Sequence, residues 1–145
     1  LDIKKLFIVE IDEEVIDVSM KYFPKFFKLT KRVKEKIIIS IDDGSRWIKN
    51  NKISFDLIIV DCTDPNPIAK KLYSKMFYQN IYKSLRRNGV LIQQSGSPIL
   101  NKEDIINPTI KNLKKLGFND IKLFPFDMPI YPLGLWSFIK CKKAQ

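Results

Sequence analysis

The sequence predicts an α/β fold: a doubly wound, mostly parallel sheet that closes with an antiparallel pair of strands. Short apolar runs alternate along the chain with segments of helical periodicity, which is the pattern of successive βαβ units. The last two apolar runs are instead separated by the Pro-rich turn MPIYPLG, which favours an antiparallel pair. With 145 residues the chain is long enough for one domain with a sizeable core, and no linker or internal repeat divides it.

The expected strands are short runs of aliphatic and β-branched residues bounded by polar or turn-forming residues. The first is the run LFIV, and the second, KIIISI, is the richest in β-branched side chains. The third, FDLIIV, is followed at once by the acidic segment DCTDP, and the fourth contains the run VLIQQ. In chain order the expected strands are residues 6–9, 36–41, 55–60, 90–94, 121–126 and 135–141.

The expected helices lie between these strands. The first has an acidic first turn and stops before Pro24, and the second is short. The third has apolar side chains at helical spacing and ends at the Asn88-Gly89 pair. The fourth is closed by Gly117, and Pro108 inside it should kink the helix or place its start later. In chain order the expected helices are residues 13–22, 45–50, 70–85 and 102–116.

The composition excludes several classes of function. The chain has no histidine, which rules out Ser-His-Asp and Cys-His catalysis and makes a zinc site very unfavourable, so that proton transfer must use carboxylates, Tyr or Lys. No apolar run reaches the length of about 18 residues expected of a membrane span, and the amino-terminal segment is not a signal peptide. Cys62 and Cys141 are then expected to be reduced thiols of a cytoplasmic protein.

The net charge of +10 raises the question of a nucleic-acid partner. Only four of the 26 basic residues are Arg, and the lysines are spread along the chain rather than clustered. A solvated lysine surface is therefore favoured over a nucleic-acid-binding module, which stays as a lesser alternative.

Six of the 16 acidic residues fall where the first three strands end. Ligands of an open parallel sheet bind in the crevice outside the carboxyl ends of its strands, so this basic protein is expected to carry an acidic crevice. The six residues are Glu10, Asp12, Asp42, Asp43, Asp61 and Asp64.

These acids also have ordinary structural interpretations. Asp12 can cap the helix that begins at residue 13, and Asp42 or Asp43 can cap the next one. Asp64, which precedes Pro65, can simply shape a turn. Taken together at one edge, however, the acids favour a binding crevice.

Several motifs resemble those of spermidine synthases, in the same order and spacing. They are VEID, IDDG, DLIIVDCTDP, LYSKMFYQNIYKSLRRNGVLIQQ and PIYPLGLWSF, and together they cover essentially the whole chain. The resemblance implies the aminopropyltransferase family, whose fold is the Rossmann-like one of class I methyltransferases. It implies transfer of an aminopropyl group from decarboxylated S-adenosylmethionine to putrescine in spermidine biosynthesis. It also implies methylthioadenosine as by-product, no metal, no prosthetic group and no nucleic-acid or membrane partner.

The resemblance further assigns roles on the nucleotide side of the site. Glu10 would bind the ribose hydroxyls, and Ile11 would pack on the adenine. Asp43 would accept a hydrogen bond from the adenine amino group.

On the amine side, Asp61 matches the acid that positions and deprotonates the attacking amine, and Asp64 matches a partner that holds the diamine. Tyr131 matches an aromatic residue lining the polyamine groove, and Gln94 matches a glutamine near the diamine, with Gln93 as the one-position alternative. A carboxylate suits this chemistry because an ammonium cannot attack until its proton is removed.

Two departures from the family pattern bear on these expectations. The family's amino-terminal β-rich domain, its first sheet strand and its GGGDG-type loop are not in the sequence, so the chain is expected to be a partial catalytic domain that folds poorly alone. The missing strand belongs between the first and third expected strands. In addition, Pro67 replaces the glycine of the loop after DCTDP, which bears on loop closure.

Other functions stay open at this point. The acceptor could be spermidine, agmatine or cadaverine, or the chain could be a methyltransferase acting on putrescine. A non-catalytic truncated paralogue that pairs with an intact synthase is an alternative of a different class. The family resemblance implies a homodimer or homotetramer in the full-length context.

Overall fold

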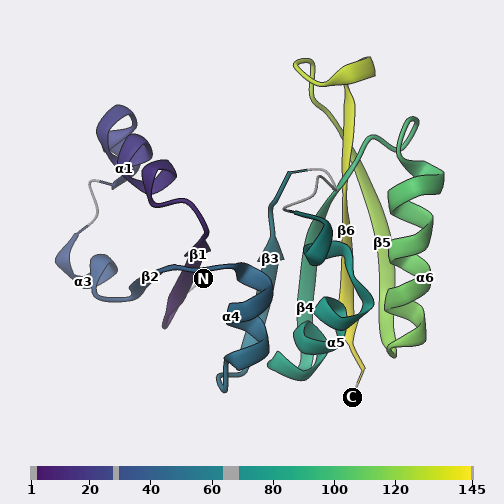
Figure 1. Ribbon diagram of the computed structural model, residues 1–145, viewed down its shortest axis with the longest axis horizontal. Coiled ribbons are helices and arrows are strands. Elements are labelled where there is room, and N and C mark those ends of the chain that lie inside the picture. Colours follow the sequence, from purple (N-terminus) through teal and green to yellow (C-terminus); the bar gives the residue numbers. More distant parts are fainter. Residues whose placement is uncertain (1–2, 28–29, 64–68, 145) are drawn as a thin grey trace. The chain divides into compact units, whose positions relative to one another are not determined.

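The computed structural model describes residues 3–27, 30–63 and 69–144 (Figure 1). The chain divides into two compact units, Leu1–Asn50 (unit 1) and Asn51–Gln145 (unit 2). Each has its own hydrogen-bonded sheet. In the described part of the chain β1 and β3 belong to different sheets.

Unit 1 is built on two parallel strands, β1 (Leu6–Glu10) and β2 (Ile37–Ile41). Its helices are α1 (Glu13–Tyr22), α2 (Pro24–Phe27), α3 (Lys31–Lys34) and α4 (Gly44–Asn50). The expected first helix is confirmed at both ends. Asp12 caps it by accepting a hydrogen bond from the Glu14 amide at 2.9 Å, so the capping interpretation of this acid is correct.

Unit 2 contains a four-stranded sheet in the order β3-β4-β6-β5. The strands β3 and β4 are parallel, whereas β6 is antiparallel to both of its neighbours, β4 and β5. The described strands pair in parallel in β1–β2 and β3–β4 and antiparallel in β4–β6 and β5–β6, so the expected antiparallel closing pair is confirmed. The bounds of the strands are β3 Phe55–Val60, β4 Leu85–Gly96, β5 Phe118–Asp127 and β6 Leu135–Lys143.

One face of the unit 2 sheet packs against α5 (Lys75–Ser84) and α6 (Asn107–Lys115). Successive side chains of β4 and β6 point to opposite faces of the sheet, so every second one faces these helices. The sheet contributes Leu91 and Ile139 to the core, and the helices contribute Ile81 and Leu113, all at 0% exposure. The other face carries exposed apolar side chains, with Ile59 at 63% exposure.

The expected single helix over residues 70–85 is wrong. A short 3-10 helix, η1 (Ala69–Tyr73), is followed by α5, because Ser74 has extended backbone angles and its hydroxyl accepts from the Phe77 amide at 3.2 Å. A new N-cap therefore interrupts the periodic apolar pattern.

The expected end of that helix at Asn88-Gly89 is also wrong. The helix stops at Ser84, and β4 begins at Leu85, which pairs with Phe55 and is 2% exposed. Asn88 has a positive φ of 60°, and a Cβ on Gly89 would lie 2.8 Å from the Arg86 carbonyl oxygen. The Asn-Gly pair marks an irregularity in the strand rather than a helix terminus.

The effect of Pro108 is as expected. A π-helical segment, η2 (Lys102–Ile106), precedes α6, and the proline occupies the first turn of α6, where its missing N–H costs no helical hydrogen bond. The expected antiparallel pair is likewise confirmed, and the short 3-10 helix η3 (Pro132–Gly134) lies in the turn between its strands.

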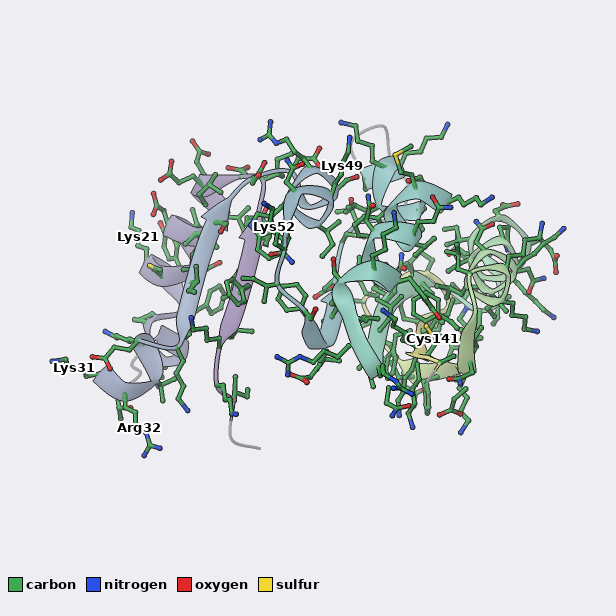
Figure 2. The ribbon with its side chains drawn as sticks, turned by 90° about the horizontal axis from the view of Figure 1, so that it is seen from below. Lys21, Lys31, Arg32, Lys49, Lys52 and Cys141 are labelled. Carbon is green, nitrogen blue, oxygen red and sulfur yellow. The ribbon has the colours of Figure 1, made fainter. Side chains whose placement is uncertain are left out.

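The charged side chains lie on the surface of each unit. Figure 2 shows Lys21 on α1 and Lys31 and Arg32 on α3 pointing away from the body of unit 1, and all three are exposed. Cys141 lies inside unit 2 at 0% exposure.

Candidate active site

A hollow of about 200 Å³ lies at the carboxyl end of β3 in unit 2. Parallel pairing brings the ends of β3 and β4 to the same edge, with Val60 opposite Gln93. The walls come from four strands and are largely apolar, and the polar side chains among them are a carboxylate, an amide and a hydroxyl. The lining residues are Ile59, Val60, Asp61, Ile92, Gln94, Phe126, Ser137 and Phe138.

Asp61 is the first residue after β3, and its side chain is exposed at the rim of this hollow. The strand fixes its position, because Val60 is buried and paired in register while the chain leaves the sheet directly afterwards. The sequence-based expectation of a carboxylate at the carboxyl edge of the sheet is met at this residue. An acid beside apolar walls can hold an ammonium group and accept its proton.

Gln94, and not Gln93, faces the hollow. Gln93 alternates to the other side of β4 and is 0% exposed on the face covered by helices. The surroundings of the Gln94 amide fix its orientation: Nε2 donates to the Cys62 carbonyl oxygen at 3.1 Å, and Oε1 accepts from Trp136 Nε1 at 2.6 Å. Gln94 therefore links β4 to the exit of β3 and to β6.

Tyr131 and Trp136 form an aromatic pair next to this amide. Their rings are stacked, with centroids 4.2 Å apart and an interplanar angle of 24°. Tyr131 is 40% exposed in the turn between β5 and β6, whereas Trp136 is 6% exposed on β6. Aromatic faces attract cations, so the pair suits an amine. Sequence reasoning did not single out Trp136, although its alternation with Phe138 along the strand pointed to the same face.

In unit 1 the carboxyl ends of β1 and β2 also meet. Glu10 pairs with Ile41, and its carbonyl oxygen accepts from the Asp42 amide at 2.9 Å. The Glu10 carboxylate folds back on the following turn, where Oε1 accepts from the amides of Ile11 at 2.8 Å and Asp12 at 3.1 Å. The Ile11 side chain is 55% exposed.

Asp43 caps α4. Its Oδ1 accepts from the Ser45 amide at 2.8 Å and from the Arg46 amide at 3.2 Å. Asp42 instead pairs with the Arg46 guanidinium and raises its pKa. The capping interpretation is therefore correct for Asp43, and any contact of this residue with a ligand would be additional to it.

The predicted site residues thus fall into two groups. Glu10, Ile11 and Asp43 share one edge of the unit 1 sheet, and Asp61 and Gln94 share the hollow of unit 2. Tyr131 joins the second group through Trp136. Asp64 and Pro67 lie outside the described residues.

Within residues 3–27, 30–63 and 69–144, no group of three or more acidic or cysteine side chains could hold a metal ion. Over the same ranges no helix combines the length and the hydropathy needed to cross a membrane.

The whole chain, residues 1–145, matches the spermine/spermidine synthase domain. The chain belongs to the spermine/spermidine synthase family. The polyamine aminopropyltransferase of Methanocaldococcus jannaschii is 41% identical over 136 residues, which are 93% of this chain and 45% of the relative. The polyamine aminopropyltransferase of Caldicellulosiruptor saccharolyticus is 36% identical over 94% of this chain and 48% of the relative. The chain spans about half the length of the curated relatives it matches.

Solved structures agree with this assignment. A spermidine synthase in complex with the transition-state analogue AdoDATO superimposes with a TM-score of 0.84 at 26% identity, over 97% of this chain and 47% of that one. Spermidine synthase from Thermotoga maritima gives 0.80 at 26% identity, over 97% and 46%. The N-methyltransferase NodS from Bradyrhizobium japonicum WM9, at 12% identity and a TM-score of 0.67 over 98% and 68%, shares the fold. The Rossmann-like, methyltransferase-type fold of this family member is confirmed.

Proposed function

We propose that the chain is the part of a polyamine aminopropyltransferase that carries the amine-activating acid, and that the reaction is aminopropyl transfer from decarboxylated S-adenosylmethionine to putrescine. The observation that carries the proposal is the position of Asp61 at the rim of an apolar hollow, beside Gln94, in a member of this family. The products are spermidine and methylthioadenosine.

In the proposed reaction Asp61 acts as the general base. Its carboxylate holds the ammonium of the acceptor and takes one proton as the nitrogen attacks the carbon bound to the sulfonium. The carbon–sulfur bond breaks, and its electron pair stays on sulfur, which leaves as a neutral thioether and needs no acid. The remaining task is orientation of two cations that repel each other, and carboxylates offset that repulsion.

The aromatic pair is proposed to lie along the acceptor. The exposed ring of Tyr131, which stacks on the nearly buried Trp136, would face the methylene chain and its distal ammonium, as aromatic faces commonly do with amines. Gln94 is assigned to the same side of the site, and the resemblance adds Asp64 as a second carboxylate toward the diamine.

The nucleotide is assigned to the edge of unit 1. Oε1 of Glu10 already accepts from two backbone amides, so the ribose hydroxyls are assigned to Oε2. Asp43, whose Oδ1 caps α4, is assigned to the adenine amino group. The exposed Ile11 side chain would pack on the adenine ring. The proposal includes no metal and no prosthetic group.

The proposal includes a cytoplasmic location, which agrees with free thiols at Cys62 and Cys141. It also includes a homodimer or homotetramer in the full-length context. Other amine acceptors, and a non-catalytic paralogue that binds an intact synthase, are outcomes of the test that follows.

The test is an isotope-labelled transfer assay with putrescine and decarboxylated S-adenosylmethionine. It is run on the 145-residue chain and on the chain completed with the part of the M. jannaschii relative that it does not span, because this chain spans only 45% of that protein. In an active form, Asp61→Asn is expected to lower kcat by about 10²- to 10⁴-fold.

The matched control is Asp56→Asn. Asp56 lies on the same strand, but its exposed carboxylate binds Arg86 at 2.8 Å and takes no part in the hollow. Equal losses in the two variants would contradict the role of Asp61. A folded protein that transfers nothing to putrescine but accepts another amine would correct the acceptor, and one that transfers nothing at all would favour the paralogue.

A further inference from the structure

The hydroxyl of Tyr73 lies where three segments meet. Tyr73 is the last residue of η1, and its ring reaches back to the exit of β3. The hydroxyl is 3.3 Å from the Thr63 carbonyl oxygen, 3.6 Å from Cys62 Sγ and 3.3 Å from the Gln94 side-chain amide. One hydroxyl thus contacts both residues that follow Asp61 and the amide that shares the hollow with it.

The direction of each contact follows from the orientation of the Gln94 amide. The amide atom of Gln94 that faces Tyr73 is also the one that faces the Cys62 carbonyl, so it is Nε2 and a donor. The hydroxyl then accepts from Gln94 and from the Cys62 thiol, and it donates its own proton to Thr63.

We propose that Tyr73 is a positioning residue for Asp61 and Gln94 in the reaction. This deepens the proposed function and rests on it. Tyr73 does not line the hollow and acts through the two residues that do. Asp61 is exposed, and the segment that follows it leaves the sheet, so the hydrogen bonds at Cys62 and Thr63 hold the direction in which its carboxylate points. Small displacements of a reacting group have large effects on rate.

The expected effect of Tyr73→Phe is confined to the chemical step. The variant keeps the ring and removes only the hydroxyl, so the fold stays intact while the exit of β3 and the Gln94 amide lose a shared partner. The kcat for aminopropyl transfer is expected to fall about tenfold, with the KM for the sulfonium donor changed less than about twofold, because the nucleotide residues lie in unit 1.

The test has two arms. In ¹⁵N-labelled 145-residue chain, the side-chain NH₂ signals of Gln94 and the backbone amide signals of Cys62 and Thr63 are compared between wild type and Tyr73→Phe. The Gln94 NH₂ protons are expected to exchange with water about five- to tenfold faster in the variant, because one hydrogen bond is lost. The second arm measures kcat and KM in the form of the protein that is active in transfer.

Tyr82→Phe is the matched control. Tyr82 lies on α5 and packs edge-on against Phe118, at the end of β6 remote from Gln94. It is expected to change neither the Gln94 signals nor kcat. Replacement of Tyr73 by para-aminophenylalanine restores a donor toward the Thr63 carbonyl oxygen but gives Gln94 Nε2 only a poor acceptor, so it is expected to bring back the Thr63 signal and not the Gln94 signals. That variant also serves if Tyr73→Phe does not fold.

The outcomes separate this inference from the proposed function. Unchanged Gln94, Cys62 and Thr63 signals in Tyr73→Phe would overturn the inference whatever the rates are. Changed signals with an unchanged kcat would overturn the positioning role in the reaction. If the signals change but no form of the protein transfers an aminopropyl group, Tyr73 still positions Gln94 and the residues after β3, and the proposed function is wrong.

Discussion

The ring of Tyr131 stacks on the ring of Trp136, with centroids 4.2 Å apart, and the Trp136 indole N–H donates to Gln94 at 2.6 Å. One nearly buried side chain therefore supports both the aromatic surface and the amide of the candidate site.

Trp136→Phe is expected to destabilise the protein more than Tyr131→Phe. The first change keeps a ring beneath Tyr131 but removes the indole N–H that donates to Gln94 Oε1. Because Trp136 is only 6% exposed, the loss of this hydrogen bond is expected to cost about 1–3 kcal/mol. The second keeps the stack and removes only the hydroxyl of a residue that is 40% exposed. Urea unfolding followed by far-UV circular dichroism measures both, and equal losses would contradict the link through Gln94.

Asp43 allows its structural and its proposed ligand roles to be separated. Asp43→Asn keeps a good N-cap for α4, whereas Asp43→Ala removes it at a cost of about 1 kcal/mol. The two are compared by hydrogen exchange at the amides of Ser45 and Arg46, where only the Ala variant should exchange faster. Binding of methylthioadenosine, measured by calorimetry, should weaken about tenfold in Asp43→Asn as well, because an amide NH₂ then faces the adenine amino group. Unchanged binding in that variant would remove Asp43 from the nucleotide site.

The two units are expected to differ in protection from hydrogen exchange. Among the described residues Ile48 is the buried apolar side chain of unit 1, while the other buried apolar side chains lie in unit 2. Few buried contacts mean low local stability, so the amides of β1 and β2 should exchange well before those of β4 and β6 in a mass-spectrometric time course. Leu113→Ala, at a position with 0% exposure, should lower the protection of unit 2 by about 2–5 kcal/mol, whereas Met76→Ala, at 63% exposure, should not. Similar protection in β1 and β4 of the wild type would contradict the prediction.

Stability is expected to fall in alkaline solution. Burial raises the pKa of the Cys141 thiol from 9.0 to about 12 and is also the main reason why the pKa of Tyr78 rises from 10.0 to about 12. Both groups stay protonated longer in the folded chain than in the unfolded one. Their contribution is therefore complete below about pH 9 and is lost as the pH rises toward 12.

The alkaline decline is measured by urea unfolding at a series of pH values. Cys141→Ala should flatten the slope against pH, even though the cavity lowers the absolute stability. Cys62→Ala is the comparison, since that thiol is only half-buried. A slope unchanged by Cys141→Ala would show that this thiol does not drive the decline.

The Asp61 carboxylate could be placed from sequence because two simple regularities agree there. An apolar run of strand length ends at Val60, and parallel strands present their carboxyl ends at one edge. The first helix was predicted to its ends for a similar reason, since an acidic first turn after Asp12 and a proline after the last turn are local signals. Both depend on residues adjacent in the chain.

Contacts between distant segments were beyond the sequence. Which of Gln93 and Gln94 faces the hollow depends on the register of β4. The apolar pattern of the preceding helix runs on to Leu85, yet β4 begins there because the Leu85 side chain is buried and paired with Phe55. Trp136 and Tyr73 matter through single polar atoms that reach Gln94 from other elements. Apolar periodicity determines which elements form and which face each one buries. It does not determine which hydroxyl or indole N–H donates to which amide. Only the packed tertiary structure of unit 2 decides that, because a hydrogen bond needs its two atoms within about 3 Å.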